Sequence, residues 1–421
     1  SQVFNFNLDN SKFYSIIKLS VALFMPLLGF SQMSETVTIN PGYTNQTFYS
    51  MANATVSTID NTDWDLAFQI SGFEAAILIN SKNNVKLFKA NKDASEWATM
   101  TAADTTGMYY SELLNNEAHM FNGAFNTTAD TSNMFDLGWG EYDLGSHAVL
   151  GDSIYFIRLN NNAVKKIWIE SLINATYNFR IADLDGSNEI QRSLQKLSYP
   201  AKNFGYYSIA NDQFLDREPT KDSWDLCFQQ YVDHFINYKV TGVLTNDSVQ
   251  SVKAYPVNDV TTATDAGYGY SFDNNLIGYD WKSFNGSTFV IEDSVAYFVI
   301  DKNNHKWKMV FTGFGGSANG NFYFDKYDMG PLSVLENNSI EAIALYPNPA
   351  TGNSQLVINS DNATTVTVDV TDLNGRLVSS FDKKVNGLNN ITIPSESFVK
   401  GIYIVKINSG KQLQQLKLVV Q

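Results

Sequence analysis

An internal repeat between about residues 40 and 330 constrains the fold more than any other feature of the chain. Two motifs, Tyr-Ser-x-Ala-Asn and Trp-Asp-Leu-x-Phe, occur in this order twice, at nearly the same spacing. The copies lie at residues 49–53 with 64–68 and at residues 207–211 with 224–228. Two further blocks recur later in each copy, and four blocks in one order rarely arise by chance. We therefore expect two tandem units, at residues 33–195 and 196–330.

The repeated blocks have the composition of β-strands. Residues 153–159 and 294–300 are rich in β-branched and aromatic side chains, and each run leads through an Asn-rich turn into another strand. The sequence thus predicts an all-β architecture, with one helix around residues 109–120. We expect Trp64 to be equivalent to Trp224, and Trp168 to Trp307.

Each Trp-Asp-Leu-x-Phe motif has a structural interpretation. The Trp is expected to fill a core layer, and the Asp to accept hydrogen bonds from backbone amides at a strand end. A ligand-binding role for Trp64 and Trp224 is the alternative.

The second copy resembles the HmuY family, haem-binding proteins of the Bacteroidetes. The resemblance is carried by residues 224–228, by the downstream run 238–246 and by the hairpin around Asp293 and Ser294. It covers most of residues 200–330 and, more weakly, residues 40–190. The resemblance implies two HmuY-like β-rich units, with haem as the expected cofactor.

Residues 343–421 form a compositionally separate unit. It opens with two prolines that exclude a helix, continues with period-2 strands and contains an Asn374-Gly375 turn. Seven short strands in fewer than 80 residues predict an Ig-like β-sandwich. Residues 331–342, which begin at a proline and are partly polar, are expected to be an accessible linker.

This C-terminal unit closely resembles the type A sorting domain of the type IX secretion system. The motifs occur in family order and end at the last residue of the chain. Their key residues are Tyr346, Pro347, Asn348, Pro349, Gly375, Gly401, Tyr403 and Lys417. The resemblance implies export across the outer membrane, removal of the module by a sortase and transfer of the cargo to surface lipopolysaccharide. The type IX machinery, the sortase and lipopolysaccharide are therefore the expected partners.

The N-terminal region has the pattern of a signal peptide. Residues 11–31 combine lysines, a short apolar stretch and small residues before a cleavage site between Ser31 and Gln32. The apolar stretch is too short to cross a bilayer, so no transmembrane span is expected in the mature form. The net charge of −14 argues against nucleic acid as a partner. The single cysteine, Cys227, excludes an intramolecular disulfide, and its apolar surroundings predict a buried thiol.

The sequence contains no recognisable catalytic or zinc-binding motif, so we expect no enzymatic activity and no metal site. If haem is bound, His234 is the first candidate ligand and His147 the second, because an imidazole can ligate haem iron axially. His234 follows a strand of the more HmuY-like copy. The sequence therefore predicts a secreted, non-catalytic surface protein that binds haem or a related hydrophobic ligand. The alternative is a structural or adhesive surface protein.

Overall fold

The computed structural model describes residues 32–72, 74–332, 340–373, 375–409 and 413–421. The predicted signal peptide at 11–31 lies outside the described residues. The chain divides into two compact units, with the boundary between Pro331 and Leu332. We call the first unit the cargo and the second the sorting module. Nearly all regular structure is β-strand, which confirms the all-β prediction.

Within the cargo, lobe 1 is the continuous segment 64–215. A sheet with the order β15-β14-β4-β5 shares a core with a larger sheet that runs β13-β12-β11-β10-β6-β7, with β8 and β9 attached to β11. The strands of lobe 1 are β4 (Leu66–Gln69), β5 (Ile77–Ile79), β6 (Lys86–Asp93), β7 (Glu112–Leu113), β8 (Gly140–Asp143), β9 (Ala148–Gly151), β10 (Ser153–Arg158), β11 (Val164–Ile173), β12 (Thr176–Asp183), β13 (Ile190–Gln195), β14 (Phe204–Ser208) and β15 (Gln213–Leu215).

Lobe 2 combines residues 32–60 with residues 224–331. A sheet with the order β3-β2-β16-β17 shares a second core with a sheet ordered β1-β23-β22-β21-β18. The strands of lobe 2 are β1 (Gln32–Thr38), β2 (Asn45–Ser50), β3 (Ala54–Asp60), β16 (Leu226–Asp233), β17 (Tyr238–Thr245), β18 (Gln250–Ala254), β19 (Lys282–Phe284), β20 (Phe289–Ile291), β21 (Ala296–Ile300), β22 (His305–Phe314) and β23 (Asn321–Pro331).

The helical segments described in the cargo are short. They are the α-helix α1 (Gly316–Asn319) and the 3-10 turns Pro41–Tyr43, Ser81–Asn83, Ala94–Thr99, Ala102–Thr105, Met108–Tyr110, Ala124–Asn126, Lys196–Ser198 and Lys221–Ser223. The helix expected at 109–120 is therefore not formed. Asn115 Oδ1 accepts the amides of Ile79 and Ala124, and Asn116 Oδ1 accepts the amide of Ala118. These bonds compete with helical ones.

The two lobes have the same strand order, which supports the internal duplication. The series β13-β12-β11-β10-β6 in lobe 1 corresponds to β1-β23-β22-β21-β18 in lobe 2, and β15-β14-β4-β5 corresponds to β3-β2-β16-β17. The first three strands of each copy therefore pack with the remainder of the other copy. The expected units 33–195 and 196–330 differ from this arrangement in two respects. β13 already belongs to the second copy, and neither copy is a packing unit by itself.

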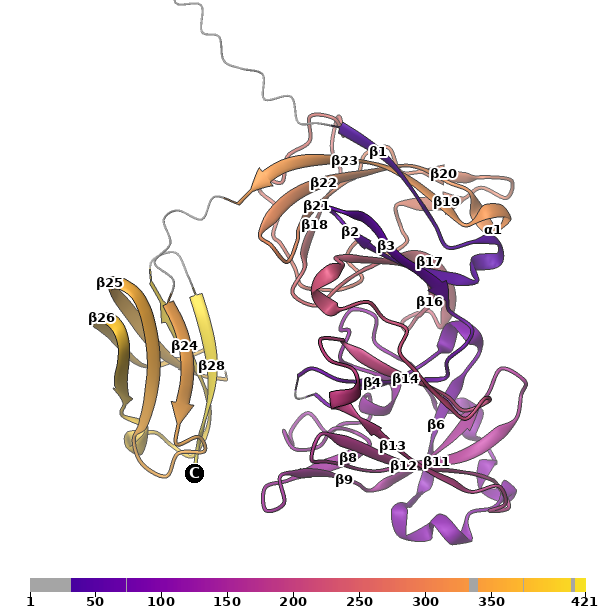
Figure 1. The fold of residues 1–421 in the computed structure, drawn as a ribbon, viewed down its shortest axis with the longest axis horizontal. Coiled ribbons are helices and arrows are strands. Elements are labelled where there is room, and N and C mark those ends of the chain that lie inside the picture. The colour runs from indigo at the N-terminus through magenta and orange to yellow at the C-terminus, as the bar shows by residue number, and fades with distance from the viewer. Residues whose placement is uncertain (1–31, 73, 333–339, 374, 410–412) are drawn as a thin grey trace, which may run out of the picture. The chain divides into compact units, whose positions relative to one another are not determined.

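Lobe 2 is closed by the first and last strands of the cargo. β1 pairs with β23 in antiparallel register, from Gln32 opposite Tyr327 to Thr38 opposite Asn321. Figure 1 shows this pairing as the indigo strand beside the orange one.

Two buried aspartates connect the copies. Asp65 Oδ2 accepts the amide of Ile209 at 2.7 Å, and Asp225 Oδ2 accepts the amide of Met51 at 2.8 Å. Burial raises the pKa of both carboxyls. The expected bond from the motif Asp to a backbone amide is confirmed, and the amide belongs to the other copy.

The register of the β10–β11 and β21–β22 hairpins corrects one of the two predicted tryptophan equivalences. Both hairpins pair a Phe with a Lys at the same point, Phe156 with Lys166 and Phe298 with Lys308. Trp168 follows its Lys by two residues, whereas Trp307 precedes its Lys by one. These tryptophans are therefore not equivalent and point to opposite faces of their sheets, because side chains alternate along a strand. Trp64 and Trp224 are equivalent, because their carbonyls accept matching hydrogen bonds from Asn80 and Asn246.

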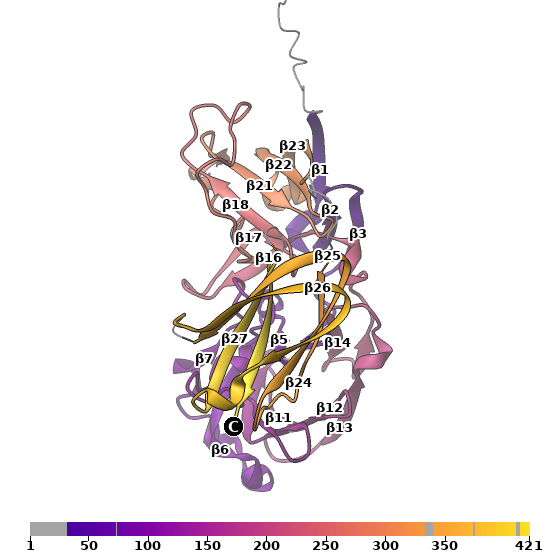
Figure 2. The same ribbon diagram turned by 90° about the vertical axis from the view of Figure 1, so that its left-hand side faces the viewer.

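The sorting module is a β-sandwich of five described strands around one core, not of seven short ones. The runs 356–358 and 366–370, which the sequence pattern predicts as separate strands, both lie in β25. This strand pairs with β26 along most of its length despite a bulge between Ser360 and Thr364. Figure 2 shows these two long, curved strands side by side. The elements are β24 (Ile340–Tyr346), β25 (Ser354–Asp372), β26 (Leu377–Ile393), β27 (Gly401–Asn408), β28 (Leu413–Val420) and a 3-10 turn at Ser395–Ser397.

Candidate functional site

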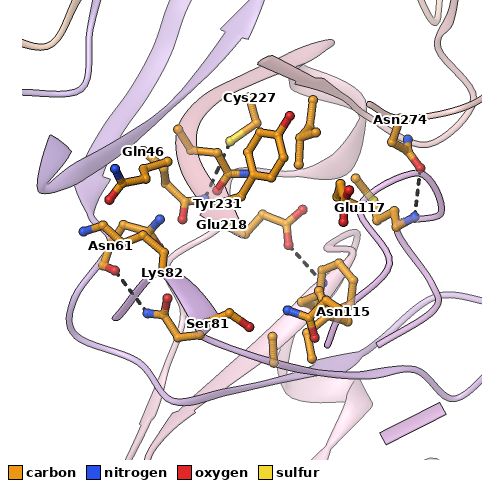
Figure 3. Close-up of a pocket in the computed structure, with 18 of the residues that line it drawn as sticks. Gln46, Asn61, Ser81, Lys82, Asn115, Glu117, Glu218, Cys227, Tyr231 and Asn274 are labelled. Carbon is orange, nitrogen blue, oxygen red and sulfur yellow. Dashed lines mark hydrogen bonds between the residues drawn. The ribbon is translucent and has the colours of Figure 1, made fainter. Parts of the chain in front are cut away.

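A cavity of about 140 Å³ lies where the two lobes of the cargo meet. β2 and β16 of lobe 2 and β4 and β14 of lobe 1 contribute to its wall, so all four strands that carry the repeated motifs reach it. Residues 115–117 and 120 from the loop after β7 also line the cavity. Figure 3 shows side chains from these segments around the shared space.

Two equivalent aromatic pairs form the walls of the cavity. Trp64 packs edge-on against Tyr206 with ring centroids 5.1 Å apart, and Trp224 packs edge-on against Phe48 at 4.9 Å. Each pair joins the Trp of one copy to a strand residue of the other. These tryptophans are buried, as the core interpretation predicts, and they also line the cavity.

The two aromatic pairs differ in their neighbours. The guanidinium of Arg217 lies 5.8 Å from the ring centre of Trp64 and 5.0 Å from that of Tyr206. It also donates to Gln46 Oε1 at 3.1 Å and forms an ion pair with Asp63 at 3.2 Å. In the described part of the chain, no comparable cation lies over the Phe48–Trp224 pair. Arg217 therefore adds a cation beside one of the two aromatic pairs, and Lys82 is a further cation in the lining.

Glu218 is a carboxyl buried in the cavity wall, with 2% of its surface exposed. Its Oε2 accepts the amide of Phe204 at 2.9 Å, whereas its Oε1 has no hydrogen-bond partner among the described residues. Burial raises the pKa of this carboxyl to about 7, although the amide bonds oppose the shift. Figure 3 shows Glu218 extending into the middle of the pocket.

Cys227 lies in the same wall and has an unreactive environment. Its thiol is buried and accepts a long hydrogen bond from Gln46 Nε2 at 3.8 Å. Burial raises the pKa of the thiol far above its ordinary value, so the nucleophilic thiolate is disfavoured. The predicted buried thiol is confirmed.

The two candidate haem ligands lie in different lobes. His234 follows β16, and its Nδ1 lies 2.8 Å from Glu117 Oε2. Glu117 lines the cavity, but His234 does not. His147 lies in the turn between β8 and β9, where its Nδ1 lies 3.0 Å from the hydroxyl of Tyr142. The structure therefore does not bring the two imidazoles together.

The lining residues do not fit an axially ligated haem. No histidine belongs to the described cavity wall. Cys227 is the only cysteine of the chain, and its thiol is held protonated. A cavity of about 140 Å³ is also smaller than the roughly 300–1,000 Å³ typical of ligand pockets.

In the sorting module, the predicted motif residues connect the two ends of the unit. Asn348 donates from Nδ2 to the carbonyl of Lys417 at 2.7 Å and accepts the amide of Val419 at 2.8 Å. The opening motif is thereby fixed to the final strand. Tyr346, Pro347 and Pro349 flank this contact.

The other motif residues shape a turn and a strand start. Gly375 has φ 79°, a left-handed conformation that glycine adopts without strain, in the turn between β25 and β26. Gly401 begins β27, and the hydroxyl of Tyr403 donates to the carbonyl of Val399 at 2.6 Å. Ser31 of the predicted cleavage site lies outside the described residues, whereas Gln32 begins β1.

Sequence reasoning missed Arg217 and Glu218. They are adjacent in the chain, between β15 and β16, and belong to no motif. Their burial results from the exchange of strands between the copies. The only signal in the sequence is a pair of charges located just before the second Trp-Asp-Leu-x-Phe motif.

A survey of the described residues finds no cluster of three or more metal-ligating side chains. Nor does any described helix have the length and apolarity needed to cross a membrane.

Comparison with known families identifies the family that the C-terminal part of the chain matches. Residues 344–421 match the family described as "Secretion system C-terminal sorting domain". The sorting-domain prediction is thereby confirmed, and the chain is a secreted protein of the outer cell surface, exported through the type IX secretion system. No curated protein matches the chain. The HmuY resemblance of the cargo stays a prediction.

Two solved structures show weak similarity. Dimeric latent PorU from Porphyromonas gingivalis is 10% identical, with a TM-score of 0.19, and the match covers 65% of this chain and 32% of that one. A β-glucuronidase from Faecalibacterium prausnitzii is 13% identical, with a TM-score of 0.17, and the match covers 56% and 41%. At these TM-scores neither match shows a shared fold.

Proposed function

We propose that this outer-surface protein is a non-catalytic binding protein and that the cavity between its lobes is the binding site. The observation that carries the proposal is a preformed cavity with aromatic walls and buried polar atoms that lack partners. Ligand sites are typically concave and mostly apolar, with a few placed polar groups.

The hydrogen bonds within the cavity wall support a role in ligand binding. Most polar side chains around the cavity are already engaged by the fold. Asn61 accepts from Trp64, Asn80 donates to two carbonyls, and Asn274 donates to the carbonyl of Thr245. A wall fixed in this way loses little conformational freedom when a ligand binds. Haem is not part of the proposal, because no histidine reaches the described wall.

Binding of benzene, a small ring that needs no hydrogen bond, tests this proposal. The variant Ala67→Leu places extra volume in the cavity, because Ala67 is buried in its wall. Saturation-transfer NMR on residues 32–421 should detect benzene with the wild type and lose at least most of the signal with Ala67→Leu. Ala90→Leu, at a buried alanine in another cluster, is the control for altered packing. Equal signals in all three proteins, or none in the wild type, would exclude the cavity as a binding site.

For surface attachment, we propose that a sortase removes the sorting module and joins the cargo to lipopolysaccharide. The boundary at Pro331 separates two units with cores of their own, so cleavage there leaves the cargo core intact. Mass spectrometry of the surface form should show a chain that lacks residues 344–421. Recovery of the uncut chain would contradict this step.

An adhesive role is the second candidate. The tip of the β16–β17 hairpin exposes Phe235 and Tyr238, at 82% and 68%, beside the exposed Ile236. Exposed apolar patches often mark contact sites. If adhesion is the function, cells that display Phe235→Ser should lose adherence, while Ala67→Leu cells keep it. The opposite pattern would favour the cavity.

A further inference from the structure

Because the chain is internally duplicated, the hydrogen bonds around the tryptophan of one copy can be compared with those around the tryptophan of the other. Asn80 Nδ2 donates to the carbonyls of Asn61 and Trp64, and Asn246 Nδ2 donates to those of Lys221 and Trp224. These matching bonds align the copies residue by residue. Lys221 therefore occupies the position that Asn61 has in the first copy.

This substitution leaves one indole without a partner. Trp64 Nε1 donates to Asn61 Oδ1 at 2.7 Å. Trp224 Nε1 is equally buried, but the described residues offer it no acceptor, because a lysine side chain cannot accept a hydrogen bond. A buried N–H without a partner costs about 1–3 kcal/mol. The second copy thus has a buried N–H donor without an acceptor at the position where the first copy provides one.

Two further residues of the described lining have an unpartnered buried atom, Ser81 Oγ and Glu218 Oε1, and the carboxyl oxygen is an acceptor. Glu218 Oε1 has no hydrogen-bond partner among the described residues, and its side chain points to the middle of the pocket. One hydroxyl group can both accept from an indole N–H and donate to a carboxylate. A hydroxyl that reaches both Trp224 Nε1 and Glu218 Oε1 would satisfy the two of them at once.

The cavity sets the size of the molecule that carries this hydroxyl. Its volume of about 140 Å³ is close to the roughly 150 Å³ of an engineered cavity in another protein that holds one benzene molecule. The aromatic pairs Trp64–Tyr206 and Phe48–Trp224 offer edges and faces to a ring. The cations Arg217 and Lys82 disfavour a cationic ring, and the carboxyls of Glu117 and Glu218 disfavour an anionic one.

We propose that the cavity takes an uncharged six-membered ring bearing a hydroxyl, which accepts from Trp224 Nε1 and donates to Glu218 Oε1. This inference rests on the proposed binding function and specifies its ligand class.

Phenol and benzene are the matched probes, since they differ only in the hydroxyl. Calorimetric titration of residues 32–421 should show that phenol binds at least about tenfold more tightly than benzene, as two net hydrogen bonds predict. Trp224→Phe should reduce this preference, because only the hydrogen bond to Glu218 Oε1 then remains. Trp64→Phe, which removes an indole N–H that is already satisfied, is the control and should keep it.

The outcomes separate the two proposals. If neither ring binds the wild type, the binding function itself fails. If both bind with equal affinity, or if Trp64→Phe and Trp224→Phe change the preference alike, the cavity binds rings but the hydroxyl assignment is wrong. The wild-type comparison decides the matter even if a variant does not fold. Methyl glucopyranoside extends the series to sugars, and binding of this probe alone would overturn the single-hydroxyl assignment.

Discussion

Replacing Glu218 by Gln should change how the stability of the cargo depends on pH. The variant keeps an acceptor for the amide of Phe204 but cannot ionise. In the wild type the carboxyl has a pKa of about 7 in the folded chain against an ordinary value of 4.5. Because one pKa unit corresponds to about 1.4 kcal/mol, ionised Glu218 destabilises the folded state by about 3 kcal/mol.

The direction of this change in stability with pH follows from proton linkage. Between pH 4.5 and 7 the folded state binds the Glu218 proton and the unfolded state releases it, so the free energy of unfolding falls as the pH rises through this window. Above pH 7 the contribution is constant. The wild type should therefore lose about 2–3 kcal/mol relative to Glu218→Gln between pH 5 and pH 8.

Urea unfolding followed by tryptophan fluorescence measures this difference. All seven tryptophans lie between residues 64 and 307, so the signal reports the cargo and not the sorting module. The stability difference between the two proteins should grow steadily from pH 5 to pH 7 and then level off. Parallel stability curves across this range would show that Glu218 is not a buried, proton-binding carboxyl.

Three further outcomes are expected. Deleting residues 344–421 should leave a folded cargo in the periplasm, measured by cell fractionation; normal export of this chain would contradict the sorting role. Asp225→Ala leaves the buried amide of Met51 without its acceptor and should lower the free energy of unfolding by about 1–3 kcal/mol in urea titrations. A loss below roughly 0.5 kcal/mol, the size expected for a surface substitution, would show that this link between the copies is unimportant. Removing β1 should expose the edge of β23, so hydrogen exchange should increase in lobe 2 and not in lobe 1; a uniform increase in both lobes would argue against separate cores.

The strand class of the chain and the duplication could be predicted from sequence because both are local signals. Alternating β-branched and aromatic residues indicate strands wherever they pack, and the motif Trp64 matches Trp224 in sequence and in structure. The exchange of the first three strands between copies could not be predicted. Identical motifs can pair within a copy or across copies, and nothing in β2 distinguishes β16 from β4 as its neighbour.

The candidate site was unpredictable for the same reason. The cavity exists because β2 and β14 each pair with a strand of the other copy, which places Phe48 beside Trp224 and Tyr206 beside Trp64. The histidine hypothesis relied on residue type and on the position of His234 after a strand of the more HmuY-like copy. His234 does lie next to a cavity residue, Glu117, but its ring is engaged by that carboxylate and does not line the cavity.

The pairing of β1 with β23 has a consequence for the order in which the chain becomes competent for export. Lobe 1 is complete once residue 215 has been synthesised, whereas lobe 2 must wait for β23, nearly 300 residues after the strand it joins. Contacts of such long range form late and slowly. The sorting module begins only after this strand, so a prematurely terminated cargo carries no signal for passage across the outer membrane. The position of the module thus restricts export to chains that possess every strand needed to close the fold.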